Sequence, residues 1–486
     1  MTPRALPALV GLPLLVSLAG CVPKAPLDRS LAPAPLPAGV FVPPAPVEAT
    51  LSNGVRVVLV ENHEVPLVYG RLVFLANGAS DPAGKEGLAS VTMDMMDEGA
   101  AGKDAAALAA SLQKLGAGLG TSAGDDGATI AFSTLARNLD PTLAVLVDVL
   151  QRPDFPVADW ELLRKKRIAG LARARKDPDA VAARVYERIL LGDAYRGRLT
   201  SEASYGAITP DDMRGWWKTN VLPDGAVLLV GGDTTLATLL PVLEARLAGW
   251  KGTGVTPSRP VAKPLPATPA IHFVDRPGAA QSVVRVGGYV TAPTDPAWYP
   301  LVLANQVVGG PFTARINMNL REDKGWTYGA RSGFAYDFAG GRFSASAGVR
   351  TDVTAPAIQE IWKELREAST TRPLGAPEFE DGRAGLLQAR PLQFENPEWR
   401  LGQEEARWRY ALPADWVTGY GANVQGVSLT RAQEAWNTVL AAAPLVTLVV
   451  GDGAQVRASL ASLGLPVIEH DPDGNVISST AAPTKE

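Results

Sequence analysis

Apolar positions along the chain follow two periods, one typical of strands and one typical of helices. Short apolar runs rich in β-branched residues predict strands at 55–60, 67–75 and 282–290, and a further strand is expected at 342–349, after an Ala-Gly-Gly turn. A three-to-four-residue apolar spacing after a proline predicts a helix, with the stripe Leu143, Leu146, Val147 and Leu150. Because strands come in adjacent pairs and helices in adjacent runs, the pattern predicts the α+β class with antiparallel sheets.

The second half of the chain repeats a pattern of the first. A helix carrying a Trp precedes a buried apolar strand ending in Gly at ITPDDMRGWWKTNVLPDGAVLLVGGD and again at SLTRAQEAWNTVLAAAPLVTLVVGDG. Trp216 matches Trp436 and Gly231 matches Gly451, both at an offset of 220 (436 − 216 and 451 − 231). Two matches at one offset indicate a duplication. We therefore expect two homologous halves, each an antiparallel sheet packed with helices.

Proline-rich stretches divide the chain into parts. Residues 22–47 have the composition of a semi-rigid, extended tether, and residues 252–270 that of a linker. These two stretches predict an N-terminal domain over 48–251 and a C-terminal domain over 271–470. A polar tail is expected over 471–486.

The first 21 residues, MTPRALPALVGLPLLVSLAGC, are typical of a secretory signal, since their apolar run is short and interrupted by proline. Leu18-Ala19-Gly20-Cys21 resembles the bacterial lipoprotein box, in which the cysteine becomes the lipidated first residue. The alternative is a plain signal peptide that happens to end at a free cysteine. Cys21 is the single cysteine of the chain, which excludes an internal disulfide and a thiolate metal cluster. Val22 after it favours the outer membrane, facing the periplasm.

The charge distribution gives no support for nucleic-acid binding. The chain has 46 Lys and Arg against 50 Asp and Glu, a formal net charge of −4, with both signs interspersed. The one dense basic run, at 164–176, is predicted to be the solvated face of a helix whose other face carries Ile168 and Leu171.

Three sequence patterns resemble catalytic or metal-binding motifs, but a structural role explains each of them better. His63 lacks the second histidine that a zinc-binding helix needs. Ser122 in GTSAG matches the nucleophile-elbow pattern, but the segment is expected to be a turn between a helix and a strand, the wrong context. Asp94, Asp97 and Glu98 are expected to share a helix face and could hold Mg²⁺ or Ca²⁺, although such clusters are more often solvated surface.

The segment GGPFTARINMNLREDKGWTYGARSGF predicts a helix–glycine–strand corner. Residues 314–324 are expected to be helical, Gly325 to cap them, and residues 326–334 to form a strand. This corner should bring Arg321 and Tyr328 close together. Both side chains can donate to a carbonyl or a developing oxyanion. The alternative is an arginine paired with a local acid and a tyrosine in the core.

The same segment resembles the C-terminal-half signature of the insulinase/pitrilysin/processing-peptidase zinc proteases. The whole body, from about 48 to 470, fits that family's layout of two homologous α+β halves. The resemblance implies that Arg321 and Tyr328 help to bind the substrate peptide next to a catalytic zinc.

The zinc of that family is held by a helix that opens with Gly-Leu-Ala and carries His-x-x-Glu-His. Here the opening is followed by Ser90-Val91-Thr92-Met93-Asp94, so Ser90, Met93 and Asp94 stand where the resemblance implies His, Glu and His. The third ligand is a glutamate on a later helix, and the matching residues 162–176 contain no acid. A catalytic zinc needs at least three protein ligands, so we expect no metal in this chain.

Some members of the family work as two chains, one with the zinc and one with the Arg/Tyr pair. The resemblance therefore implies a non-catalytic, substrate-binding subunit of a heterodimeric zinc peptidase at the cell envelope, inactive alone. The zinc would belong to a homologous partner, and an extended peptide would add to a sheet edge. One alternative is an inert scaffold or peptide-binding envelope protein. The other is an enzyme with replacement chemistry at Asp94, Asp97 and Glu98.

Overall fold

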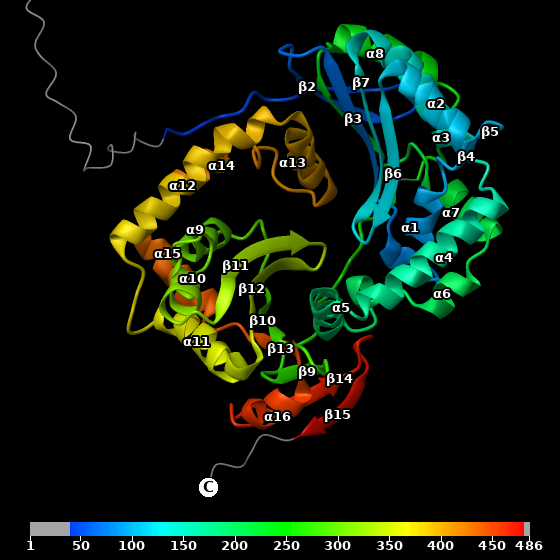
Figure 1. Cartoon of the computed structure of the whole chain (residues 1–486). Coiled ribbons are helices and arrows are strands. Elements are labelled where there is room, and N and C mark those ends of the chain that lie inside the picture. Colours follow the sequence, from blue (N-terminus) through cyan, green and yellow to red (C-terminus); the bar gives the residue numbers. More distant parts are fainter. Residues whose placement is uncertain (1–38, 256, 481–486) are drawn as a thin grey trace, which may run out of the picture. The chain divides into compact units, whose positions relative to one another are not determined.

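The structure, a computed structural model, describes residues 39–255 and 257–480 (Figure 1). Cys21 and most of the predicted tether lie outside the described residues. No helix among the described residues has the length and apolar character needed to cross a membrane.

The N-terminal half is built on a six-stranded sheet. Its order is β1 (Val47–Thr50), β2 (Arg56–Glu61), β8 (Val227–Gly232), β3 (Leu67–Phe74), β7 (Gly127–Leu135) and β6 (Gly118–Gly124). A two-stranded ribbon adds β4 (Gly99–Ala100) and β5 (Lys103–Asp104). The helices of this half are α1 (Leu88–Asp94), α2 (Ala105–Leu115), α3 (Leu139–Gln151), α4 (Val157–Ala174), α5 (Pro178–Leu191), α6 (Glu202–Ala207), α7 (Pro210–Asn220) and α8 (Leu236–Leu247).

The C-terminal half has a seven-stranded sheet. Its order is β11 (Thr327–Asp337), β12 (Gly340–Arg350), β10 (Gln281–Thr291), β13 (Val446–Gly451), β9 (Ile271–Asp275), β14 (Val467–His470) and β15 (Val476–Thr480). Its helices are α9 (Trp298–Val308), α10 (Arg315–Asn317), the π-helical η4 (Met318–Asp323), α11 (Thr354–Glu367), α12 (Ala376–Glu395), α13 (Pro397–Arg409), α14 (Tyr420–Gln425), α15 (Leu429–Ala435), the π-helical η6 (Trp436–Leu440) and α16 (Gly453–Ala461).

The two sheets have the same central topology, which confirms the predicted duplication. β8 lies between a parallel partner, β2, and an antiparallel partner, β3. β13 lies in the same way between parallel β9 and antiparallel β10. Every residue of β8 and β13 is buried, as expected for the apolar runs that end in Gly231 and Gly451. The predicted α+β class is confirmed, with a parallel pair at the centre of each otherwise largely antiparallel sheet.

Local sequence explains how the helices begin. Thr209 accepts a hydrogen bond from the backbone N–H of Asp212, and the carboxylate of Asp212 accepts one in return from Thr209. Such a capping box, followed by proline at the first helical position, satisfies amide groups that the helix leaves without partners. Asp104 caps α2 in a similar way through the N–H of Ala107.

Each half sends one helix onto the sheet of the other half. α5 precedes the linker, yet Val181, Val185 and Tyr186 form a buried cluster with Leu448 and Val450 of the second sheet (Figure 1). α13 follows the linker and packs on the first sheet, where its Leu401 lies among Val58, Val73, Val227 and Leu229. The described residues of the linker contain no helix or strand.

Two of the predicted elements are wrong. GTSAG, expected to be a turn, is part of strand β6, because Gly118–Gly124 pairs with β7 over its whole length. Asp97 and Glu98 do not share a helix face with Asp94, because α1 ends at Asp94. The predicted helix at 164–176 is confirmed as part of α4, and Ile168 and Leu171 pack against the core.

His272 of β9 and His470 of β14 form a buried pair at the C-terminal sheet. The Nδ1 of His470 lies 3.1 Å from the carbonyl oxygen of Gly474, which can only accept, so this nitrogen carries a proton. The Nε2 of His470 is therefore the acceptor for His272 Nδ1, 2.9 Å away. Burial, and to a smaller extent the neighbouring His470, lowers the pKa of His272 to about 4.

We predict that this pair makes the fold sensitive to acid. The unfolded chain takes up a proton at His272 below pH 6.5, whereas the folded chain takes it up only below about 4. The free energy of unfolding should therefore fall as the pH decreases through this window, by about 3 kcal/mol from this residue. Urea unfolding of wild type and His272→Gln between pH 4 and 7.5 measures the difference.

His63→Gln is the control, because the His63 side chain is 53% exposed and its hydrogen bond to Asp233 raises its pKa. Removing this histidine should therefore not reduce the loss of stability in acid. Equal pH dependence in wild type and His272→Gln would contradict the prediction.

Candidate functional site

Helix α1, which the resemblance equates with the zinc helix, is anchored at its start by Asp81. The Asp81 carboxylate accepts hydrogen bonds from the backbone N–H groups of Gly87 and Ala89, at 2.8 and 2.9 Å. Burial raises the pKa of Asp81 to about 6. Leu88 and Val91 face the core, so the helix is held in place from both its first turn and its apolar face.

An arginine joins the two positions where the family has its zinc-binding histidines. Arg167 of α4 forms an ion pair with Asp94, and its Nη2 also lies 3.4 Å from Ser90 Oγ. The side chains of Arg167 and Asp94 are 36% and 24% exposed, so the pair is partly shielded from water. A guanidinium stays charged at any physiological pH. The guanidinium of Arg167 therefore lies where the family binds zinc, and its positive charge would repel Zn²⁺.

The position of the family's catalytic glutamate holds no general base. Met93 is fully buried in the core of the N-terminal half. Its carbonyl oxygen accepts a hydrogen bond from Thr121 Oγ1 of β6 at 2.6 Å, which ties α1 to the edge of the sheet. The residues present at Ser90, Met93 and Asp94 thus do not fit a zinc site.

The alternative cation site at Asp94, Asp97 and Glu98 is not assembled. Asp94 is neutralised by Arg167, and Asp97, beyond the end of the helix, accepts a hydrogen bond from Thr121 at 3.3 Å. Burial raises the pKa of Asp97, which disfavours its charged form. Within the described residues, no group of three or more His, Cys, Asp or Glu side chains could hold a metal ion.

The second candidate site is the corner between η4 and β11, and the predicted helix–glycine–strand geometry is observed. Gly325 has a φ of 64°, the left-handed conformation that ends the helix. Asn317 clamps the corner, since its side chain donates to Phe312 O and accepts from the N–H of Ala330. The π-helical turn η4, which carries Arg321, is a feature that often marks functional sites.

Arg315, part of the same signature, is structural. Its side chain is 4% exposed and pairs with Glu378 at 2.6 Å. It also donates to the carbonyl oxygens of Arg372 and Pro373, so all of its contacts are internal. The residue fixes the start of α10 against the segment before α12.

Arg321 and Tyr328 both lie at the surface of the corner. The Arg321 guanidinium lies 4.6 Å from the centre of the Phe312 ring, and its Nε is 3.2 Å from Glu322. Tyr328 is 87% exposed. Neither side chain is part of the core. Among the described residues, no hydrogen bond or ion pair joins these two side chains to each other or to Ser90, Asp94 or Arg167.

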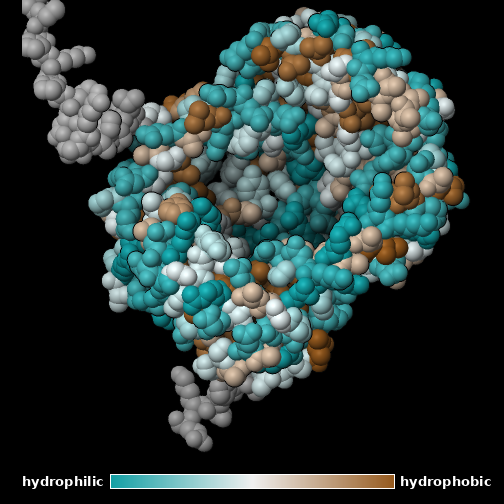
Figure 2. All heavy atoms as spheres, in the orientation of Figure 1, coloured by the Kyte–Doolittle hydropathy of each residue, from teal (hydrophilic) through white to brown (hydrophobic). Residues whose placement is uncertain are grey.

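The sheets differ in which edge is open. At β11 the backbone N–H of Ser332 donates to Gly309 O and that of Ala330 donates to Asn317, so this edge is partly closed. β6 pairs only with β7 among the described strands, and apart from Leu119 and Thr121 its residues are glycine, alanine and serine. A flat edge of this kind can accept another strand. The face in Figure 2 is hollowed, and largely hydrophilic side chains line the hollow.

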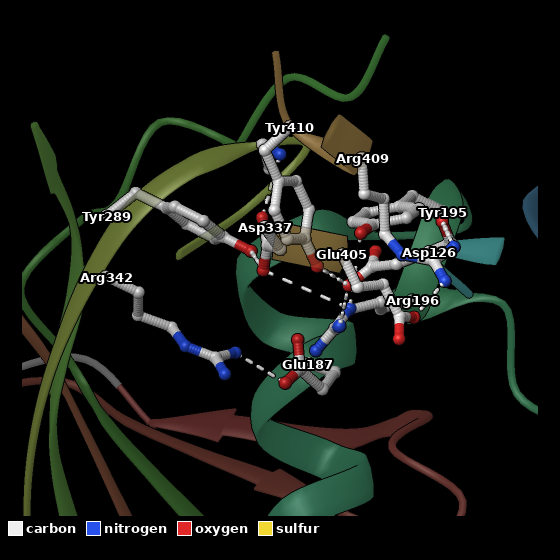
Figure 3. A network of polar contacts seen from close by, with 11 residues as sticks. Asp126, Glu187, Tyr195, Arg196, Tyr289, Asp337, Arg342, Glu405, Arg409 and Tyr410 are labelled. Carbon is white, nitrogen blue, oxygen red and sulfur yellow. Dashed lines mark hydrogen bonds and ion pairs between the residues drawn. The ribbon is translucent and has the colours of Figure 1, made fainter. Parts of the chain in front are cut away.

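A polar network that no sequence motif predicts joins the two halves (Figure 3). Asp126, in the turn after β6, forms an ion pair with Arg196 and accepts a hydrogen bond from the Tyr410 hydroxyl at 2.5 Å. Arg196 is also 4.0 Å from Asp337 at the end of β11, and Tyr289 donates to Asp337 at 2.7 Å. These groups come from both sides of the linker, so the network fixes one half against the other.

Comparisons with known proteins agree with these observations. Residues 207–386 match the family described as Peptidase M16 inactive domain. The chain is 23% identical over 396 residues to the Non-peptidase homolog YmxG of Helicobacter pylori, covering 78% of this chain and 88% of the relative.

Solved structures show the same fold. The M16 inactive domain from Pseudomonas fluorescens superposes with a TM-score of 0.77 at 23% identity, covering 84% of this chain and 98% of that one. A protease from Helicobacter pylori has a TM-score of 0.75 at 16% identity, covering 84% of this chain and 99% of that one.

We predict that the purified chain retains no stoichiometric zinc and cleaves no unfolded peptide. The reason is the Arg167–Asp94 pair at the metal position and the buried Met93 in place of a base. Elemental analysis and a quenched-fluorescence peptide assay measure the two properties. A homologue that carries His-x-x-Glu-His, purified in the same way, is the positive control. Chelator-sensitive cleavage by this chain alone would contradict the prediction.

Proposed function

The chain belongs to the insulinase (M16) peptidase family, as a member without the zinc motif, and we propose that it is the substrate-binding subunit of a heterodimeric zinc peptidase. The observation that carries the proposal is the contrast between its two sites. The metal position is filled by the Arg167–Asp94 pair, whereas the Arg321/Tyr328 corner is intact and exposed. A chain that served only as a scaffold would have no need for an arginine and a tyrosine exposed at that corner.

In this proposal the corner acts on the substrate of a homologous partner chain. The partner's zinc ion would supply the activated water that attacks the peptide carbonyl. Arg321 and Tyr328 would donate hydrogen bonds to the peptide near that carbonyl. The Asn317 clamp and the Gly325 turn support this role, because donors held on a rigid corner need little reorganisation on binding.

The substrate would be an extended peptide added to β6. The side of Gly118–Gly124 that faces away from β7 offers backbone groups for main-chain hydrogen bonds.

The alternative function is that of an inert scaffold or peptide-binding envelope protein. The polar network around Asp126 and Arg196 favours it, since the Arg196–Asp337 ion pair and the hydrogen bond from Tyr410 to Asp126 hold the two halves in one arrangement. The mutational test below separates the two functions.

We also propose that the chain is lipid-anchored at the cell envelope, in the outer membrane facing the periplasm, on the strength of the lipoprotein box. Cys21→Ser should leave the protein unlipidated and release the mature product from membranes, which membrane fractionation and mass spectrometry of the N-terminus measure. A variant that fractionates like the wild type would show that the anchor lies elsewhere.

We predict that Arg321→Ala and Tyr328→Phe lower peptide turnover by the reconstituted pair by about a hundredfold or more, because each removes a donor to the reacting carbonyl. Both residues lie outside the core, so the melting temperature and the assembly of the pair should change little. Steady-state cleavage, thermal melts and size-exclusion chromatography provide the three measurements.

Two controls make the result specific. Arg431→Ala removes an exposed arginine on α15 and should leave turnover unchanged. Trp216→Ala removes a side chain that is 7% exposed and should destabilise the fold by about 3 kcal/mol or more. Full turnover by both corner variants in an assembled pair would favour the scaffold.

A further inference from the structure

Two equivalent hollows lie on the two sheets, each beside the helix that crosses from the other half. In the N-terminal half the hollow is about 320 Å³ and is lined by β3, β6, β7 and α13. In the C-terminal half it is about 360 Å³ and is lined by β10, β11, β12 and, through Tyr186, α5. The duplicated topology makes β3, β7 and β6 the counterparts of β10, β12 and β11.

The two hollows differ in charge. The N-terminal hollow holds one arginine, Arg71, which is paired with Glu405 at 3.0 Å, and a second acid, Glu398. The C-terminal hollow holds three arginines and no acid in its lining, namely Arg285, Arg331 and Arg342. Among the described residues, only Arg342 of these three has an acidic partner, the adjacent Glu187 of α5 (Figure 3). With Glu187 included, the local charge is +2, from three arginines minus one glutamate.

Strand register explains how this cluster forms. Arg285, Ser346 and Arg331 lie directly opposite one another across β10, β12 and β11, so they share one face of the sheet. The next row along the strands is Gly287, Ser344 and Gly333, which have almost no side-chain volume. Ser344 and Gly333 of this row line the hollow together with Arg285, Arg331 and Ser346.

Two arginines in this hollow have donor groups with few partners. The Nε of Arg285 is buried and makes no hydrogen bond with any described residue. Arg331 is exposed and makes a single long contact among the described residues, 3.3 Å to Gly310 O. A buried donor without an acceptor is costly, so the Arg285 Nε beside an open hollow indicates a ligand that accepts hydrogen bonds.

We propose that this hollow binds carboxylate groups of an acidic peptide, either Asp and Glu side chains or a free C-terminus. The planar guanidinium groups of Arg285 and Arg331 can each form two parallel hydrogen bonds with a carboxylate. The hydroxyl groups of Ser344 and Ser346 lie between them and can donate to the same anion. The inference rests on the proposed function only in taking the ligand to be a peptide.

The test measures binding of labelled peptides to the mature chain by fluorescence anisotropy. Four peptides of equal length are compared: a Glu-rich peptide with an amidated C-terminus, a Gln-rich peptide with a free C-terminus, its amidated form, and a Lys-rich peptide. We expect the Glu-rich peptide to bind at least tenfold more tightly than the amidated Gln-rich peptide, and salt to weaken it. Tighter binding of the free than of the amidated Gln-rich peptide would identify the C-terminus as a source of the carboxylate.

Three variants locate the site. Arg285→Gln and Arg331→Gln should each weaken binding of the Glu-rich peptide about tenfold, the loss of one charge-assisted contact. Gly333→Leu should block the hollow, because a Cβ at this position meets no atom within 4 Å and extends into open space. Arg431→Gln, which removes the same charge elsewhere on the surface, should bind as the wild type does.

The outcomes separate this inference from the proposed function. Equal binding of Glu-rich and amidated Gln-rich peptides, or unchanged binding by a folded Arg331→Gln variant, overturns the inference whatever the reconstituted pair does. Displacement by inorganic phosphate without a preference for acidic peptides overturns the carboxylate assignment. The remaining outcome is peptide binding that follows the predicted pattern while Arg321→Ala and Tyr328→Phe leave turnover by the reconstituted pair unchanged. That outcome supports the inference and contradicts the proposed peptidase role.

Discussion

The exchange of helices between the two halves is the constraint on which the rest of the structure depends. α5 covers apolar residues of the second sheet, and α13 covers those of the first. Burial of Val181, Val185, Leu190 and Leu191 alone contributes on the order of 10 kcal/mol, which would be lost if the halves separated. Neither half can therefore be treated as an independent domain, although each has its own core under its own helices.

The charge of Asp94 on α1 is balanced by an arginine. Without Arg167, the Asp94 carboxylate, whose side chain is only 24% exposed, would be a partly buried charge without a partner. Arg167 supplies the positive charge from α4, the helix that the resemblance equates with the one carrying the third zinc ligand. The packing of Leu88, Val91 and Met93 is retained, so the helix keeps its structural task without its chemistry.

Much of the fold could be predicted from the sequence, because caps, turns and apolar periods are local signals. The Gly325 turn and the strands ending in Gly231 and Gly451 were predicted correctly. β6 was missed because glycine and serine conceal the strand period.

The contacts between distant segments could not be predicted. The apolar stripe of α5 shows that one face is buried, but not under which sheet. The basic run at 164–176 was predicted to be solvated, and periodicity cannot show that Arg167 turns toward Asp94. The Arg285–Ser346–Arg331 row depends on the register of three strands, which no single segment encodes.

The exchanged helices also determine how the duplicated hollows differ. α13 brings Glu398 and Glu405 to the N-terminal hollow, and Glu405 neutralises Arg71 there. α5 brings Tyr186 to the C-terminal hollow, while its Glu187 is engaged by Arg342, so that Arg285 and Arg331 keep their charge without an acidic partner among the described residues. The same helices that hold the halves together thus give two equivalent positions different electrostatic character. A duplicated fold can in this way lose the chemistry of one half and still present a charged, selective surface on the other.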